Sequence, residues 1–185
     1  LLPSLAAARD AARATKCLVN MNNMAKALTM YALNNREQLP TVGLAHGGHI
    51  VDEQGSWLVL LQDYAGDDEL IYRCPSDRSP FWETKFGSRF RRVSYATNYY
   101  VAGFAQTKDY TNLKSISKPD RVIYAVELFE GNASGDPEGI DDFETYNEFV
   151  AADHIHADEW VAVPRSIDKQ IMRYRHAGQS NYVFL

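Results

Sequence analysis

The sequence predicts an α+β fold in which a long N-terminal α-helix packs on a mainly antiparallel β-sheet. Apolar residues recur at mostly three- and four-residue spacings over residues 1–35, which indicates one helix with a single apolar stripe. Short apolar or alternating segments between turn residues follow later in the chain and indicate strands. A helix followed by strands, in a chain of 185 residues, is typical of a single α+β domain spanning residues 1–185.

The predicted helix contains Pro3 in its first turn, where the missing N–H costs nothing, and the pattern closes at Asn35 and Pro40. It should be about 45–50 Å long, against roughly 30–35 Å for the globular remainder of the chain. One end of the helix is therefore expected to project. Its first half is rich in Ala and suits close packing on another helix, while residues 18–31 carry bulky side chains that suit a sheet. The alternative is an ordinary N-terminal helix with a frayed end.

The rest of the chain, residues 36–185, is expected to form a globular α+β head. Pro and Gly break every period over residues 36–54 and indicate a loop. Residues 56–66 form an amphipathic pattern with Ser at the N-cap and Gly at the C-terminus, which predicts a short helix. Strands are predicted over residues 70–73, 92–103, 121–129, 159–164 and 181–185.

The composition is that of a globular domain, with 45% hydrophobic and 23% charged residues. No apolar run reaches the roughly 18 residues that a membrane-spanning helix needs. The net charge of −5 argues against general nucleic-acid binding, because such binding depends on neutralising phosphates. We therefore expect no nucleic-acid partner.

The first 31 residues hold apolar, Ala, Arg and Cys residues in a distinctive order. The positions are Leu1, Leu2, Pro3, Leu5, Ala8, Arg9, Ala12, Arg13, Cys17, Asn20, Ala27 and Tyr31. This order resembles the segment that follows the membrane-spanning part of bacterial type IV pilin-like proteins, which comprise the pilins and the type II secretion pseudopilins. In such prepilin-derived proteins the mature chain begins with a methylated Phe and about twenty apolar residues. The resemblance implies that a membrane-spanning half of the helix is missing ahead of Leu1.

The C-terminal end is similar to one large bacterial class of these proteins. That class ends in a His, nine residues and then Asp-Gly, and here His176 is followed by nine residues before the chain stops. The match is to half of the motif. Residues 72–77 and 94–99 are also similar to that class.

The resemblance implies a structural subunit of a type IV pilus-like or type II secretion pseudopilus filament, without enzymatic activity. Such a subunit assembles through its helix, here Leu5, Ala8 and Ala12. Its partners would be copies of itself, other pilins or pseudopilins, the assembly machinery and the inner membrane. It would lie in the inner membrane before assembly and then in a periplasmic or extracellular filament.

Cys17 and Cys74 are the only cysteines. A bridge between them would join the helix to the sheet, and the export that the resemblance implies favours a disulfide. The alternative is two buried free thiols. Two cysteines without a CxxC pair argue against a zinc site.

Residues 127–159 carry eleven acidic side chains and no Lys or Arg. Part of this segment is rich in oxygen ligands and glycine, although it does not match the spacing of an EF-hand. It is either a calcium loop or a solvated acidic loop, so we expect either no cofactor or calcium. The candidate ligands are Asp136, Glu138, Asp141, Asp142 and Glu144.

Histidines offer two further candidates for chemistry. His154 and His156 would lie on one side of a strand and suggest the alternative function, an exported metal-dependent enzyme or ligand-binding domain. An exposed polar loop is the simpler interpretation of that segment. His176 and Glu127 could form a buried polar pair between two strands or a catalytic base, although the sequence shows no nucleophile beside them.

Basic and aromatic residues alternate over residues 78–92. The basic residues are Arg78, Lys85, Arg89, Arg91 and Arg92, and the aromatic ones are Phe81, Trp82, Phe86 and Phe90. Such a segment can bind single-stranded nucleic acid, but more often it is an edge hairpin or an interaction surface. Together with the acidic segment it would favour head-to-tail contacts between subunits.

Overall fold

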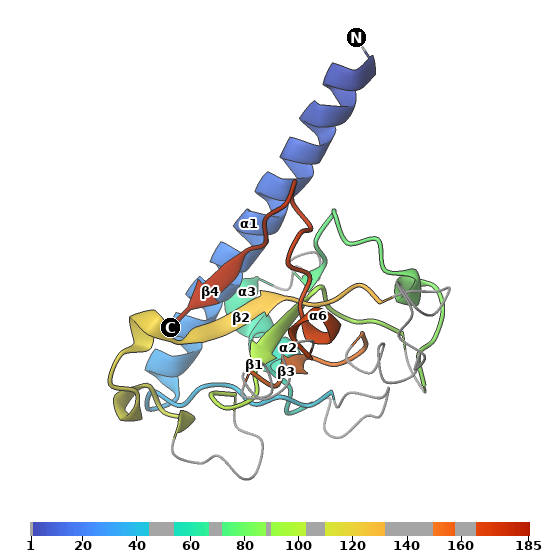
Figure 1. Ribbon diagram of the computed structural model, residues 1–185. Helices are drawn as coiled ribbons and strands as arrows, with labels where there is room; N and C mark the ends of the chain where they lie inside the picture. The colour runs from blue at the N-terminus through green and yellow to red at the C-terminus, as the bar shows by residue number, and fades with distance from the viewer. Residues whose placement is uncertain are drawn as a thin grey trace.

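A computed structural model describes residues 2–44, 54–66, 72–87, 90–102, 110–131, 150–157 and 166–185. The longest element is the helix α1 (Leu2–Asn34), which confirms the predicted N-terminal helix. Figure 1 shows that its N-terminal half leaves the head while its C-terminal half lies against the sheet. Helix α1 ends where Arg36 and Glu37 take left-handed backbone angles, with φ of 57° and 62°. Pro40 follows and prevents the helix from continuing.

The two halves of α1 differ in burial, as the distribution of small and bulky residues predicts. Residues 3–13 are exposed, and Leu5 retains 50% of its accessible surface. From Cys17 onward, side chains at helical spacing are buried on the head; they are Cys17, Asn20, Met21, Met24, Ala27, Leu28 and Ala32. The expected projection of one end of the helix is therefore confirmed.

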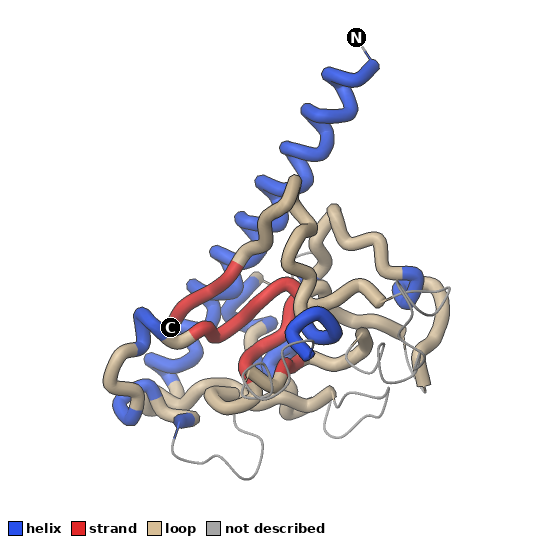
Figure 2. Tube along the Cα trace, viewed as in Figure 1, coloured by secondary structure: helices blue, strands red, loops and turns tan. Residues whose placement is uncertain are grey.

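The sheet has four strands in the order β3-β1-β2-β4. They are β1 (Tyr95–Asn98), β2 (Ile123–Glu127), β3 (His154–Ile155) and β4 (Tyr182–Phe184). Strand β2 pairs antiparallel with both β1 and β4, and the short β3 pairs parallel with β1. Figure 2 shows these strands beside the head-packed half of α1. The predicted α+β fold with a mainly antiparallel sheet is confirmed.

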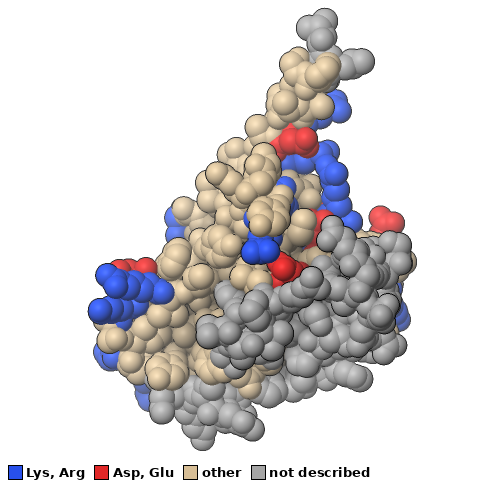
Figure 3. Space-filling model, viewed as in Figure 1, with Lys and Arg blue, Asp and Glu red and all other residues tan. Residues whose placement is uncertain are grey.

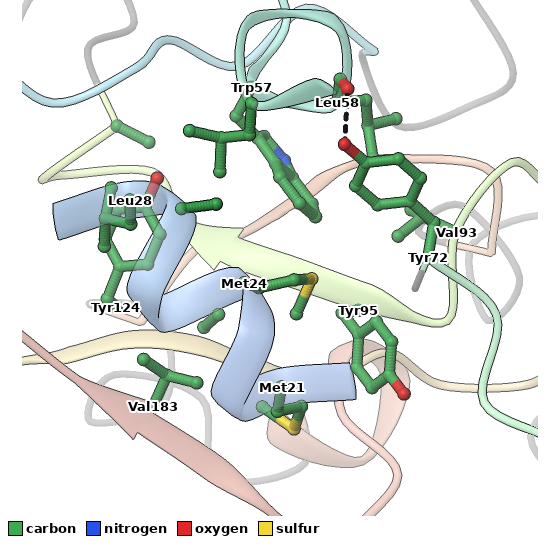
Figure 4. Packing of buried hydrophobic residues seen from close by; sticks show 14 of the residues in the cluster. Met21, Met24, Leu28, Trp57, Leu58, Tyr72, Val93, Tyr95, Tyr124 and Val183 are labelled. Carbon is green, nitrogen blue, oxygen red and sulfur yellow. Dashed lines mark hydrogen bonds between the residues drawn. The ribbon is translucent and has the colours of Figure 1, made fainter. Parts of the chain in front are cut away.

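The core lies between α1 and the sheet, and the short helices α2 (Trp57–Leu60) and α3 (Gln62–Ala65) close it. Figure 4 shows Met21, Met24 and Leu28 of α1 pointing into this core, which also contains Trp57. The Tyr72 hydroxyl donates a hydrogen bond of 2.8 Å to the backbone oxygen of Leu58. Burial raises the pKa of Tyr72 to about 12, which is consistent with a hydroxyl enclosed by apolar groups.

Several predicted boundaries differ from the structure. The expected helix over residues 56–66 is split into α2 and α3, and it ends at Gly66 with φ 81°. Tyr72 and Arg73 form no strand, because this segment turns into the Cys74 loop. The strand predicted over residues 92–103 is limited to β1, since the chain turns after Asn98. Residues 159–164 lie outside the described residues.

Some short elements are missing from the predicted helices and strands, and two of them contribute to the core. The strand β3 is two residues long, and the helix α6 (Ser166–Gln170) has five. Both help to enclose a second apolar cluster; its buried members are Ala96, Val126, Leu128, Ala152, Ile155 and Ile171. Elements this short are stabilised by tertiary contacts and leave little periodicity in the sequence.

Candidate functional site

A disulfide joins Cys17 of α1 to Cys74, with 4.9 Å between the two Cα atoms. These are the cysteines that the sequence analysis expected to be bridged. Cys17 is the first buried residue of α1 among the described side chains, so the bridge lies where the helix leaves the head. The Asn20 side chain adds a hydrogen bond of 3.0 Å to the backbone oxygen of Arg73. The base of the projecting helix is therefore attached to the head both covalently and by hydrogen bonding.

Beside the disulfide lies a buried polar pair. His176 Nε2 donates to Glu127 Oε1 over 2.6 Å, and Glu127 is at the end of β2. Glu127 also accepts hydrogen bonds from the Ser180 hydroxyl (2.9 Å) and from the Asn181 side chain (3.0 Å). A tight turn positions His176, with φ of 88° at Gly178. The expected pair between Glu127 and His176 is confirmed, and it anchors the C-terminal segment that leads into β4.

A second buried network contains two arginines and two carboxylates. Arg91 Nη2 lies 2.8 Å from Asp77 Oδ2, and both side chains are fully buried. Arg175 lies 3.7 Å from the same carboxylate and 2.9 Å from Glu130. Arg91 also donates to the backbone oxygens of Phe129, Val150 and Leu128. The guanidinium of Arg91 thus joins loops that are distant in the sequence.

This network corrects the interpretation of residues 78–92 as a basic and aromatic surface. Arg91 is buried in an ion pair with Asp77, and Phe81 is buried in an apolar cluster with Val150 and Ala151. Trp82 stacks under the guanidinium of Arg73, 4.4 Å from the ring centroid. Of the named residues, Arg89 lies outside the described part of the chain. The exposed remainder includes Arg78, Lys85 and Phe90.

Asp77 makes stability depend on acid pH. Burial alone would raise the pKa of Asp77, but Arg91 and Arg175, with hydrogen bonds from Ser94 and Ser79, hold it below its ordinary value of 3.8. Because the folded pKa is lowered, this contribution is complete above the unfolded pKa and is lost as pH falls through the folded one. We expect Asp77→Asn to be less stable at pH 7 but to lose less stability than the original protein between pH 5 and pH 2. Urea unfolding at stepped pH measures this, and equal losses in the two proteins would contradict it.

The segment around His154 is buried, so its interpretation as an exposed polar loop is wrong. Strand β3 places His154 opposite Thr97 at one edge of the sheet, where the His154 side chain is buried. The carboxylate of Asp153 accepts backbone hydrogen bonds from Gly43 (2.9 Å) and Leu44 (3.1 Å), and it lies 3.3 Å from His154 Nδ1. Through these hydrogen bonds the buried carboxylate of Asp153 holds the loop after α1 against the sheet.

His154 of β3 and His156, which directly follows the strand, do lie on one side of the chain, since their rings stack with centroids 5.2 Å apart. The ring of His156 also stacks on Tyr99 at 4.6 Å. Within the described residues, the one group of three or more candidate metal ligands within 4.8 Å is Cys17, Cys74, Glu127 and His176. In that part of the chain, His154 and His156 therefore do not belong to a group of three candidate ligands.

The proposed calcium ligands lie outside the described residues; they are Asp136, Glu138, Asp141, Asp142 and Glu144. Two other members of the acidic segment are buried rather than solvated. Glu127 binds His176, and Asp153 binds the backbone of residues 43 and 44. The solvated acidic loop is thus a wrong description for these two residues.

The projecting part of α1 presents two different faces. One face borders a groove of about 610 Å³ between the helix and the C-terminal segment, lined by Ala7, Ala11, Ala14, Met172, Tyr174 and Arg175 among others. Leu5, Ala8 and Ala12 lie roughly 120° around the helix from the three alanines of the groove. Figure 3 shows the projecting helix as a largely uncharged surface with Lys and Arg side chains gathered along one side.

Sequence reasoning missed Asp77, Arg91 and Arg175 as a buried unit. The available signal was weak: Asp77 closes the segment 72–77 that is similar to pilin-like proteins, and Arg175 directly precedes His176. In the structure, Arg175 lies beside Asp77, and the next residue, His176, lies 3.9 Å from the sulfur of Cys74 in the disulfide.

These features define a pilin-like α+β fold, in which a long helix is half packed on a small sheet and half free of the head. A family model described as "Protein of unknown function (DUF1559)" matches residues 6–71 of the chain. The matched region includes Ala8, Ala12 and Cys17 but does not reach His176. Comparisons with curated proteins and with solved structures found no match. Among the described helices, none combines the length and apolar character needed to cross a bilayer.

Proposed function

We propose that the protein is a structural subunit of a type IV pilus-like or type II secretion pseudopilus filament and that it assembles through its N-terminal helix. The observation that carries this proposal is the exposure of residues 3–13 on a helix whose next turns are built into the core. A short isolated helix is marginal in water, and residues 3–13 stay exposed although one side of them borders the groove beside the C-terminal segment. A neighbouring helix is the partner that its surface fits.

The chemistry of the exposed face supports a helical partner. Leu5, Ala8 and Ala12 lie at spacings of three and four residues and so form one continuous stripe. Small residues allow two helix backbones to approach closely, which is the dominant attraction between helices in an apolar environment. The same alanines would bury little area on a sheet.

The buried polar groups fit a structural role for the head. Glu127, His176, Asp77 and Arg91 bind one another and the backbone, and they join the C-terminal segment and loops to the sheet. In the proposed function the protein has no catalytic activity. It would lie in the inner membrane before assembly and then in a periplasmic or extracellular filament, with other subunits and the assembly machinery as its partners.

We expect the double substitution Ala8→Glu and Ala12→Glu to abolish filaments in cells that produce the protein from its native gene. Two carboxylates on the stripe would have to be buried without partners at the helix contact, which is strongly unfavourable. The melting temperature of purified protein spanning residues 1–185 should change by less than about 2 °C, because surface substitutions away from packed features have small effects. Electron microscopy of sheared filaments and thermal unfolding measure the two quantities.

The matched control is Ala8→Ser with Ala12→Ser, which keeps both side chains small. Serine is common at close helix contacts, so filaments should form in normal number. The opposite result would be a Glu variant whose head is unfolded but which still forms filaments. That result would show that this half of α1 stabilises the head and does not mediate assembly.

A further inference from the structure

We infer that the protein binds one zinc ion when the disulfide is reduced, with Cys17, Cys74, His176 and Glu127 as ligands. One ligand atom of each residue lies within 4.8 Å of all the others. Two thiolates, an imidazole and a carboxylate are all ordinary zinc ligands, and four of them satisfy its tetrahedral coordination. Each is supplied by a different part of the chain: α1, the Cys74 turn, the end of β2 and the turn at His176.

The distance between one sulfur and the imidazole is close to that which a zinc ion spans. Cys74 Sγ lies 3.9 Å from His176 Nε2. Zinc bonds of about 2.3 Å to sulfur and 2.1 Å to nitrogen, at a tetrahedral angle, separate those two atoms by roughly 3.6 Å. Nε2 of His176 lies 2.6 Å from Glu127 Oε1 in a direct hydrogen bond, and an ion between the two atoms would separate them to roughly 3.3 Å. Small side-chain shifts after reduction are enough to bring the four atoms around one ion.

The surroundings are those of a closed structural site. Cys17, Cys74 and Glu127 are buried, and the side chain of His176 is 8% exposed. Ser180 and Asn181 hold the carboxylate of Glu127 in place by hydrogen bonds. Among the described residues, Nδ1 of His176 has no hydrogen-bond partner. A hydrogen-bond partner on the second ring nitrogen of a metal-binding histidine contributes about 10–100-fold to metal affinity. Since Nδ1 lacks one among the described residues, we expect a dissociation constant for zinc on the order of 1 µM at pH 7.

The redox state decides whether the site exists. Reduction adds two electrons and two protons to the disulfide and gives two thiols; a phosphine reductant supplies the electrons and takes the oxygen of a water molecule. Each thiol then loses its proton on binding zinc, and His176 Nε2 loses the proton that it donates to Glu127. In the oxidised protein neither sulfur is available as a thiolate, so the cluster loses half of its ligands.

The test is a zinc titration of phosphine-reduced and oxidised protein, in competition with a chromophoric chelator, at pH 7. We expect one zinc per reduced chain and at least tenfold weaker binding to the oxidised chain. His176→Gln should weaken binding at least tenfold, whereas His156→Gln, which changes a histidine outside the cluster, should leave it unchanged. Cobalt in place of zinc should give the absorption of a tetrahedral site with thiolate ligands.

Stability provides a second readout if a reduced variant is only partly folded. Zinc should raise the melting temperature of the reduced protein but not that of the oxidised protein. The variant Cys17→Ser with Cys74→Ser should show no such rise in either condition. Absence of zinc binding to the reduced protein would overturn the inference. Equal affinity in His176→Gln would also overturn it, because the cysteines alone would then explain the bound zinc.

Discussion

Arg91→Ala should lower the free energy of unfolding by about 3–5 kcal/mol, the cost of breaking a buried ion pair from one side. After the substitution the fully buried carboxylate of Asp77 keeps its hydrogen bonds from Ser79 and Ser94, but its nearest basic partner becomes the more distant Arg175, 3.7 Å away. The substitution also removes the hydrogen bonds of Arg91 to the backbone oxygens of Phe129 and Val150, while the Leu128 oxygen keeps a hydrogen bond of 2.7 Å from Arg175. Urea unfolding at pH 7 measures the loss.

Two variants isolate the role of the guanidinium. Arg91→Lys keeps the charge but has no planar fork, so most of the loss should remain. Arg78→Ala removes an exposed arginine of the same segment and should change stability by less than about 0.5 kcal/mol. A loss below about 1 kcal/mol for Arg91→Ala would show that Asp77 is not held by this partner.

Removing the disulfide should cost about 4 kcal/mol, because Cys17 and Cys74 are 57 residues apart and the bridge restricts the unfolded chain. The double variant Cys17→Ala with Cys74→Ala should unfold at correspondingly lower urea concentration. Reductant should produce a similar loss in the original protein and none in the variant. Both comparisons are made without added metal.

Thiol titration supplies the control for this prediction. Protein that is denatured without reductant should show no reactive thiol, since the described residues include no free cysteine and the sequence has only these two. Two reactive thiols per chain would contradict the bridge, and the stability comparison would then concern buried free cysteines.

The main elements of the fold could be predicted because they leave long or clear patterns. Helix α1 repeats its apolar stripe over 33 residues, and β2 is a continuous apolar run after a Pro-Asp turn. Strand β3 could not be predicted from two residues, because its pairing with β1 depends on a partner more than fifty positions earlier in the chain. Burial of Asp153 and His154 follows from that pairing and not from local sequence.

The candidate site was predictable only where its residues stand out in the sequence itself. Cys17 and Cys74 form the sole cysteine pair, and His176 stood out by its place near the C-terminal end. Arg91 lies among other basic and aromatic residues, where local composition suggests an exposed surface. Its burial is determined by Asp77 and by carbonyls of distant loops, which only the folded chain brings together.

The central claim is that the projecting half of α1 packs against the same helix of neighbouring subunits. A photoreactive phenylalanine analogue at position 8, in protein made from its native gene, tests this most directly. Irradiation of assembled filaments followed by mass spectrometry should identify crosslinks from position 8 to residues 1–16 of another copy, and position 26, which is exposed on the head-packed half, serves as the control. Crosslinks from position 8 that stay within one chain, with none between subunits in assembled filaments, would contradict assembly through this helix.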